Sequence, residues 1–339
     1  ATEMQSPANE AMDVHYQATA DIDEAPTPTP SATSHPKKRS RQNEYQAGEI
    51  IDNRYRVIEL LGRGGMGIVY KVEHTRLKSK KKYLALKILH SHIAQNPRVL
   101  KRFQREIEVM MDFSHKNIVT IRDFGYDRNG NPYFTMDLCT GISLKKIIEQ
   151  KGPLAINDTL EITEQVLQAL ASAHAQKIVH RDLKPENILV QQSQNQLRVQ
   201  ILDFGIAKNL SDDVTEKITI GIVGTILYMS PEQAQGEEVG VTSDIYSLGV
   251  TLYQMVTGKL PFDGTTQEVL YKQIHVTPTA PSYLRKNLPD VVEQLILKAM
   301  AKEPAERYQN AEEFARAVAE VRPQIQNKKQ QATHTTQEH

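Results

Sequence analysis

Residues 180–205 read HRDLKPENILVQQSQNQLRVQILDFG, and the rest of the chain is best interpreted outward from them. Two short apolar runs flank a polar stretch within residues 188–202, which predicts a β-hairpin. Asp182 precedes the first arm and Asp203 follows the second, so the hairpin brings two carboxylates toward each other with Asn187 close by. Carboxylate and amide oxygens suit Mg²⁺ bound to a nucleotide, and a second carboxylate suits a hydroxyl nucleophile.

Composition sets the outer bounds. The chain has 339 residues, 39% of them apolar, with 41 basic and 41 acidic side chains. This length suggests about two domains, and a net charge of zero gives no indication of nucleic acid or an anionic membrane as a partner. The single cysteine, Cys139, cannot form an internal disulfide, which fits a reducing compartment. No apolar run approaches the ~20 residues of a membrane span. We therefore expect a cytoplasmic protein, or the cytosolic part of a longer membrane-anchored one.

A glycine-rich stretch, GRGGMGIVY at residues 62–70, follows a predicted strand that begins at Tyr55. Glycines allow backbone amides to approach phosphate oxygens closely, because no side chain intervenes. The same spacing occurs in dinucleotide-binding folds, where the glycines lead into a helix. Here β-branched and aromatic residues follow, which favours a second strand and a glycine hairpin over the phosphates.

Lys87 lies inside the apolar strand 84–89, where a lone cation is costly unless an anion meets it. We expect that anion to be Glu106, on a helix predicted over residues 97–112. The alternative is a surface Glu106 that pairs with Arg102 one turn earlier. Helical spacing assigns this helix a core face made of Val99, Phe103, Ile107, Met110 and Met111.

The remaining elements complete an α+β pattern. Strands are predicted at 118–124 and 133–138, which gives a five-stranded antiparallel sheet. Helices are predicted at 143–150, 156–176 and 243–257, and the last helix should end near Val321. Residues 1–48 carry few large apolar groups and are expected to be disordered. Their small basic cluster, which could be a docking or nucleic-acid patch, is better explained as a solvated linker. Residues 323–339 are expected to be a polar tail.

These motifs resemble those of protein kinases, and the resemblance covers about residues 50–322. The sequences of residues 64–70, 230–234 and 242–249 are similar to those of the eukaryotic-like Ser/Thr protein kinases of bacteria. The resemblance implies a bilobal fold, with a small antiparallel N-lobe that carries one main helix (49–138) and a larger, mainly helical C-lobe (139–322). It implies transfer of the γ-phosphate of ATP to Ser or Thr hydroxyls of proteins, with Mg²⁺ required.

The resemblance assigns a task to each motif residue. Asp182 would accept the proton of the incoming hydroxyl, and Lys184 would meet the γ-phosphate. Lys87, held by Glu106, would contact the α- and β-phosphates, while Asn187 and Asp203 would hold Mg²⁺. Met136 would be the gatekeeper, and the Asp137 carbonyl and the Cys139 amide would hold adenine. The predicted nucleotide pocket comprises Leu61, Gly62, Gly64, Gly65, Met66, Gly67, Val69, Ala85, Lys87, Met136, Asp137, Cys139 and Leu189.

The resemblance also bears on specificity. Lys184, two residues after Asp182, and the pair Gly224-Thr225 are typical of Ser/Thr kinases, in which that Thr contacts both the catalytic Asp and the Lys. Two structural contacts are implied as well. Glu232 should pair with Arg307, and Asp244 should anchor the backbone of residues 180–181. The alternative for Asp244 is an ordinary acid at a helix N-terminus.

Regulation is predicted at Arg181, which precedes the catalytic Asp and can pair with a phosphothreonine in the activation segment. Thr219 is the first candidate, Thr215 the second, and Thr225 a further acceptor; the alternative is an exposed loop threonine. We expect activation by autophosphorylation, which could proceed in trans through self-association.

Several alternatives remain at this point. Asp182 could be a turn residue, Asn187 a capping residue, and Cys139 a small buried apolar residue. A small-molecule phosphotransferase would share the acid and magnesium loops, but would usually lack the long segment that ends in Pro231-Glu232. A pseudokinase that only binds partners would lack one of the catalytic residues, and none is missing here.

Overall fold

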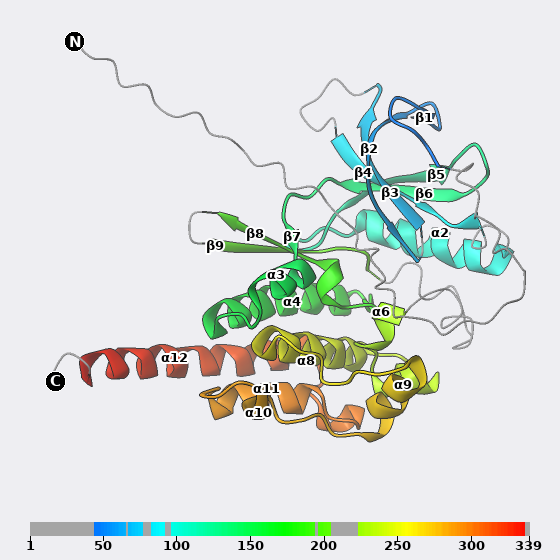
Figure 1. The fold of residues 1–339 in the computed structure, drawn as a ribbon. Coiled ribbons are helices and arrows are strands. Elements are labelled where there is room, and N and C mark those ends of the chain that lie inside the picture. The colour runs from blue at the N-terminus through cyan, green and yellow to red at the C-terminus, as the bar shows by residue number, and fades with distance from the viewer. Residues whose placement is uncertain are drawn as a thin grey trace, which may run out of the picture.

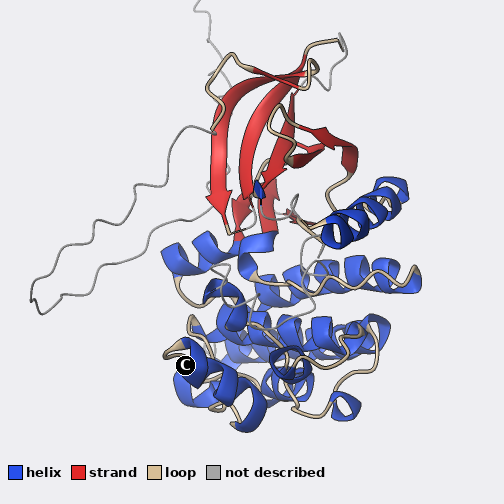
Figure 2. Cartoon of the chain, turned by 90° about the vertical axis from the view of Figure 1, so that its right-hand side faces the viewer, coloured by secondary structure: helices blue, strands red, loops and turns tan. Residues whose placement is uncertain are grey.

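The computed structural model of this chain describes residues 44–65, 67–76, 83–91, 96–193, 196–204 and 223–335. These residues form two lobes, a β-sheet lobe that carries one long helix and a lobe built mainly of helices (Figures 1 and 2). The α+β, bilobal architecture predicted from the sequence is confirmed. Within the described ranges, no helix combines the length and the apolar character that a membrane crossing needs.

The N-lobe sheet is antiparallel, with the strand order β1-β2-β3-β4-β6-β5. Its strands are β1 (Ile50–Ile51), β2 (Tyr55–Gly64), β3 (Gly67–His74), β4 (Tyr83–Leu89), β5 (Ile121–Tyr126) and β6 (Pro132–Asp137). The sequence predicted five strands, and the two-residue β1 adds a sixth.

Helix α2 (Pro97–Asp112) packs on this sheet and begins where Asn96 accepts hydrogen bonds from the next turn. It buries Phe103, Ile107 and Met110, as predicted, while Val99 is partly buried. Met111 is 37% exposed, so its assignment to the core face is wrong. At 100° per residue it lies outside the buried stripe, past the edge that Ile107 forms.

The C-lobe is organised around α8 (Val241–Thr257), in which almost every residue from Ser243 onward is buried. A Cβ at Gly249 would lie 2.9 Å from Ala299, so a glycine is required where this helix meets α11 (Asp290–Ala299). The other helices are α3 (Leu144–Lys151), α4 (Ile156–Ala175), α6 (Val223–Ile226), α7 (Pro231–Gln235), α9 (Thr266–His275), α10 (Pro281–Leu284), α11 (Asp290–Ala299) and α12 (Ala311–Thr335).

A second, three-stranded sheet lies on the C-lobe side of the junction between the lobes (Figure 1). It consists of β7 (Ile142–Ser143), β8 (Ile188–Ser193) and β9 (Gln196–Ile201). Strands β8 and β9 form the hairpin predicted from residues 188–202, and a short 3-10 turn, Pro185–Asn187, precedes them. This hairpin is what brings the two ends of the opening motif together.

The folded part of the chain begins earlier than predicted. Residues 1–48 were expected to be disordered, but the structure describes the chain from Glu44, and Tyr45 is only 4% exposed. The ring of Tyr45 packs edge-on against Tyr70, and the guanidinium of Arg128 lies 4.5 Å from its centre. An aromatic ring that finds an aromatic and a cationic partner can order a polar segment that has no apolar period of its own.

The C-terminal end also differs from the prediction. Residues 323–339 were expected to be a polar tail, yet α12 continues to Thr335 with Pro323 inside it. The helix lies along α4, where Ile325 is buried and Arg322 forms an ion pair with Glu164 at 2.6 Å (Figure 1). These contacts with α4 explain why the helix continues into a segment whose polar composition suggested a tail.

Candidate active site

One buried carboxylate shapes the loop that carries Asp182. Asp244, near the start of α8, is fully buried and accepts the backbone N–H groups of His180 and Arg181, each at 2.8 Å. Arg181 has a φ of 63°, a left-handed conformation that costs energy in a residue other than glycine. The two hydrogen bonds to Asp244 stabilise this conformation, and the predicted anchoring role of Asp244 is confirmed as a contact.

His180 adds a second constraint on the same loop. Burial lowers the pKa of His180 against the opposing effect of nearby carboxylates, so its imidazole is neutral near pH 7. Its Nδ1 lies 3.2 Å from the backbone N of Asp182, and its Nε2 lies 3.1 Å from the carbonyl oxygen of Leu202. A neutral ring that accepts at Nδ1 and donates at Nε2 satisfies both contacts. His180 thus connects the loop before β8 to the loop after β9.

Asp182, Lys184 and Thr225 form a compact triangle. The Lys184 ammonium lies 3.3 Å from Asp182 Oδ2 and donates to the Thr225 hydroxyl at 2.9 Å, and that hydroxyl donates to Asp182 Oδ1 at 3.3 Å. Burial alone would lower the pKa of Lys184, but the carboxylates of Asp182, Glu186 and Asp203 outweigh it and raise that pKa. Lys184 is therefore a cation fixed beside the carboxylate, and the predicted contacts of Thr225 are present.

Asn187 and Asp203 lie at the two ends of the β8–β9 hairpin, where the backbone N–H of Leu202 donates to the carbonyl oxygen of Asn187 at 2.8 Å. The Asn187 amide donates to the backbone oxygen of Asp182 at 2.8 Å, which fixes its orientation. Asp203 follows β9 and has a φ of 49°. Its Oδ2 lies 2.6 Å from the Lys87 ammonium, while its Oδ1 is buried and has no hydrogen-bond partner among the described residues.

An unsatisfied, buried carboxylate oxygen fits a bound cation. Among the described residues, no three side chains of His, Cys, Asp or Glu gather in a way that could enclose a metal ion by themselves. This donor set suits Mg²⁺, which protein usually holds through one or two carboxylates while water and phosphate oxygens complete the octahedron.

Lys87 lies in the middle of β4, opposite Val69 of β3 and Phe134 of β6, and is 9% exposed. The ion pair described for it is with Asp203, on the far side of the junction between the lobes. Glu106 is half-buried on α2, next to the core residue Ile107. The predicted Lys87–Glu106 pair stays a prediction.

The glycine-rich hairpin joins β2 to β3, as its sequence predicted. A Cβ at Gly67 would lie 2.0 Å from the carbonyl oxygen of Ile88, so β4 can pair here only with a glycine. A Cβ at Gly64 would meet nothing within 4 Å. Gly67 is therefore needed by the sheet itself, whereas the space over Gly64 is open. Gly62 lies in β2 and Gly65 in the turn, while Met66 lies outside the described residues.

The apolar residues predicted for the nucleotide pocket lie on five different strands, are all buried and belong to one hydrophobic cluster: Leu61, Val69, Ala85, Met136 and Leu189. Cys139 follows the last of the N-lobe strands and is half-buried. Burial raises the pKa of its thiol to about 12, so it remains protonated and unreactive near pH 7. That these residues hold adenine stays a prediction.

The connection between the lobes contains an ion pair that the sequence did not reveal. Arg122 of β5 binds the carboxylate of Asp137 through two hydrogen bonds, at 2.7 and 2.6 Å. The pair fixes the end of β6, where the backbone leaves the N-lobe. Alternating strand residues give no signal for such a cross-strand partner, because strand register decides it.

The segment after α6 is hydrogen-bonded to the loop that carries Asp182, which we call the catalytic loop. Ser230 caps α7 in a capping box with Gln233, whose side chain also donates to the carbonyl oxygen of Arg181 at 3.0 Å. Glu232 forms the predicted pair with Arg307 through two hydrogen bonds at 2.8 Å. Burial raises the pKa of Glu232, but hydrogen bonds from Arg307 and Ser243 outweigh it and lower that pKa. These contacts hold the segment that contains α7 against the loop that carries Asp182.

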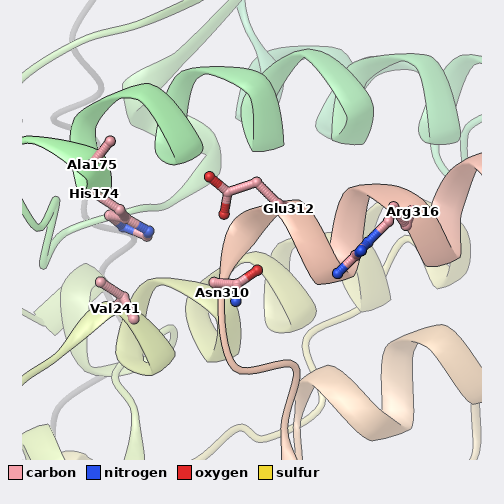
Figure 3. Close-up of a pocket in the computed structure, with 6 residues that line it drawn as sticks. All are labelled: His174, Ala175, Val241, Asn310, Glu312 and Arg316. Atoms are coloured by element: carbon pink, nitrogen blue, oxygen red, sulfur yellow. The ribbon is translucent and has the colours of Figure 1, made fainter.

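A separate hollow of about 580 Å³ lies between the end of α4, the start of α8 and the start of α12 (Figure 3). His174 lines it at the end of α4 and contacts Asp244 through Nε2 at 2.8 Å. None of the predicted site residues borders this hollow. Its lining consists of His174, Ala175, Val241, Asn310, Glu312 and Arg316.

The fold, the triangle around Asp182 and the paired Lys87 and Asp203 define a phosphotransferase of the protein kinase type. The model of the protein kinase domain matches residues 55–318, and the chain belongs to this family.

Within the family, the chain is similar to bacterial Ser/Thr kinases. It is 40% identical over 277 residues to the probable serine/threonine-protein kinase PknB of Lactococcus lactis, covering 81% of this chain and 43% of that protein. It is 39% identical over 269 residues to the serine/threonine-protein kinase PrkC of Bacillus subtilis, covering 79% and 40%. The chain thus spans less than half the length of these relatives.

Solved structures of kinase domains have the same fold. The crystal structure of the Mycobacterium tuberculosis PknI kinase domain superposes with a TM-score of 0.65 at 28% identity, covering 82% of this chain and 99% of that one. Two of the predicted regulatory residues, Thr215 and Thr219, lie outside the described residues, so their role stays a prediction.

Proposed function

We propose that this chain is an ATP-dependent protein-serine/threonine kinase that requires Mg²⁺. The observation that carries the proposal is the triangle of Asp182, Lys184 and Thr225, with distances of 2.9 to 3.3 Å. A carboxylate base, a fixed cation and a threonine that orients both are what transfer of a phosphoryl group to a hydroxyl requires.

In this mechanism, the hydroxyl of a substrate Ser or Thr binds beside Asp182. Its oxygen attacks the γ-phosphorus of ATP, its proton passes to the Asp182 carboxylate, and the bond from the γ-phosphorus to the bridging oxygen breaks to release ADP. Lys184, which stays charged, donates to the γ-phosphoryl oxygens as their charge changes. A positioned general base of this kind contributes roughly 10²–10⁴-fold in rate.

Lys87, Asn187 and Asp203 would hold the phosphates and the metal ion. Mg²⁺, when bound, neutralises charge on the phosphate oxygens. The unsatisfied Oδ1 of Asp203 and the fixed amide of Asn187 are the oxygen-bearing groups that would bind it. Lys87 then shares its charge between Asp203 and the phosphates, and Glu106 would orient it from α2.

We infer that phosphorylation of the activation segment raises activity, in trans if two copies associate. The Nε of Arg181 is buried and has no hydrogen-bond partner among the described residues, which suits a guanidinium that receives a phosphate. Thr219 is the first candidate acceptor and Thr215 the second. The acceptors in other proteins are Ser and Thr side chains, and we place the reaction in the cytoplasm, where ATP is available.

The test uses a peptide library in which Ser, Thr or Tyr is the single acceptor, with Mg-ATP as the donor. The wild-type chain should phosphorylate the Ser and Thr peptides, and Asp182→Asn should reduce the rate by at least about 10²-fold while Mg-ATP still binds. Transfer to Tyr alone, or to free small molecules instead of peptides, would contradict the proposal. Nucleotide binding without any transfer would favour a pseudokinase.

A further inference from the structure

A glutamine on α9 makes an unusually complete set of buried contacts. Gln273 is 0% exposed, and its amide nitrogen donates to the carbonyl oxygens of Ile226 at 3.2 Å and Leu227 at 2.9 Å. Its amide oxygen accepts the hydroxyl of Tyr246 at 2.6 Å. A buried amide that uses both donors and its acceptor holds its neighbours in one arrangement, because any shift would leave a polar group unsatisfied.

The two carbonyl groups lie directly after Thr225, the residue whose hydroxyl bridges Lys184 and Asp182. Ile226 and Met229, on the same segment, also pack against Val269 of α9 in a small hydrophobic cluster. The position of the segment that carries Thr225 is therefore set by the inner face of α9 as well as by the catalytic residues.

The glutamine is itself fixed from behind. Lys302 donates to the backbone oxygen of Gln273 at 2.7 Å, to that of Lys272 at 3.1 Å and to the hydroxyl of Tyr246 at 3.3 Å. Tyr246 is fully buried on α8, the central helix of the lobe. The contacts thus run from the core of the C-lobe through Gln273 to the segment beside the catalytic base.

We propose that Gln273 is a positioning residue for transfer to a polypeptide substrate. Gln273 holds residues 226–227 in place, so that the Thr225 hydroxyl lies beside both Asp182 and the acceptor hydroxyl. The inference rests on the proposed function, since it concerns transfer to a polypeptide. It adds a residue from α9, about 47 positions away in sequence from the carbonyl it binds, that no catalytic motif contains.

The alternative is that Gln273 only stabilises the lobe. The two roles predict different effects of a substitution at Gln273. If the residue is only structural, the substitution should lower the stability of the fold and affect the peptide and the nucleotide alike. A positioning residue would change the use of the peptide and leave nucleotide binding alone.

The experiment uses Gln273→Glu, which keeps the shape and the acceptor for Tyr246 but replaces the donating amide by a carboxylate that faces two carbonyl oxygens. Losing a buried donor should lower kcat/KM for a Ser or Thr peptide by roughly 5- to 150-fold, with the Kd for Mg-ATP unchanged. Tyr246→Phe, which removes the partner of the Gln273 oxygen, should act in the same direction. Tyr253→Phe is the matched control. It removes a hydroxyl on the same helix that donates to the carbonyl of Thr279 at 3.0 Å, and should leave kcat/KM unchanged.

A pH series separates the two roles further. When protonated, the introduced carboxyl group can again donate to the carbonyl of Leu227, so the activity of Gln273→Glu relative to the wild type should rise as the pH falls. In the described part of the chain, the titratable and charged groups near this position are Tyr246, Lys302 and, beyond them, Arg307, which lies over the Tyr246 ring, with its partner Glu232. The wild-type amide does not titrate, so it serves as the reference at each pH.

Amide hydrogen exchange gives a readout that needs no catalysis. The segment 223–229 should exchange faster in both variants than in the wild type and in Tyr253→Phe. The role of Gln273 would be overturned if the wild-type chain phosphorylates the peptide and both variants show the same kcat/KM and the same hydrogen exchange as the wild type. Absence of transfer in the wild-type chain, with Mg-ATP bound, would instead overturn the proposed function. If Gln273→Glu does not fold, Tyr246→Phe decides by the same two measurements.

Discussion

Replacing Asp244 by asparagine tests how strongly one buried carboxylate holds the catalytic loop. Asp244 accepts three hydrogen bonds at 2.8 Å, from the backbone of His180, the backbone of Arg181 and the ring of His174. Asp244→Asn keeps one oxygen but turns an amide NH₂ group toward at least one of these donors. Hydrogen bonds to a charged acceptor contribute ~1.5–3 kcal/mol, and a buried donor without an acceptor costs ~1–3 kcal/mol. We therefore expect the free energy of unfolding to fall by about 2–4 kcal/mol.

Catalysis should suffer as well, because Asp182 follows the two anchored residues directly. A shift of the loop by an ångström can reduce kcat by roughly 10²-fold. The assays are urea unfolding and peptide phosphorylation at saturating Mg-ATP. The control is Asp290→Asn, an exposed acid in the first turn of α11, where a favourable interaction with the helix N-terminus is worth ~0.3–1 kcal/mol. If Asp244→Asn behaves like Asp290→Asn in both assays, the anchoring argument is wrong.

Three further outcomes follow from the geometry. The ion pair of Glu232 with Arg307 should stabilise the fold above pH 4.5, the ordinary pKa of a Glu carboxyl, and this stability should be lost as the pH falls through the lower pKa of Glu232 in the folded state. Glu232→Gln should remove this pH dependence and cost about 3–5 kcal/mol at neutral pH. Urea unfolding of both proteins from pH 7 to pH 3 measures the two effects. Gly67→Ala should weaken Mg-ATP binding and lower the unfolding temperature, because its Cβ would lie 2.0 Å from the backbone of the neighbouring strand, whereas Gly64→Ala should fold normally; equal unfolding temperatures for the two variants would contradict this. Thr225→Ala should lower kcat by roughly 10- to 100-fold through the lost hydrogen bonds, with Thr225→Ser near wild-type activity, and steady-state kinetics that show equal loss in both would exclude the hydroxyl as the cause.

The sequence predicted those parts of the fold that short-range patterns encode. Short apolar runs and period-3.6 apolar spacing located most of the strands and helices to within a few residues, and α2 had the predicted bounds of Pro97 and Asp112. The site motifs worked for the same reason. Asp182, Asn187 and Asp203 are brought together by one hairpin, whose arms and turn are all visible in 26 consecutive residues of the opening stretch, 180–205.

The sequence failed where contacts join distant segments. Nothing near Tyr45 indicates that the ring will pack between Tyr70 and Arg128, so the start of the folded region was placed too late. The polar composition of residues 323–339 suggested a tail, but α12 packs along α4 and continues to Thr335. These are tertiary contacts that override local preference.

Two features of the site were hidden for the same reason. The pairing of Lys87 with Asp203 joins the two lobes across 116 positions in sequence. The contacts of Gln273 depend on how α9 is placed against α6 and α8. A glutamine on a helix is ordinarily a surface residue, and only the fold shows that this one is fully buried and satisfied.

The central claim is that Asp182 serves as the base for phosphoryl transfer to Ser and Thr hydroxyls. The most direct test incubates the purified chain with Mg-ATP and follows its intact mass, with Asp182→Asn as the control, and then maps the modified residues by mass spectrometry. The account predicts added phosphate on Ser or Thr in the wild-type chain, including Thr215 or Thr219, and none in Asp182→Asn although it binds Mg-ATP equally well. Equal phosphorylation of both proteins, or phosphate on tyrosine alone, would contradict it.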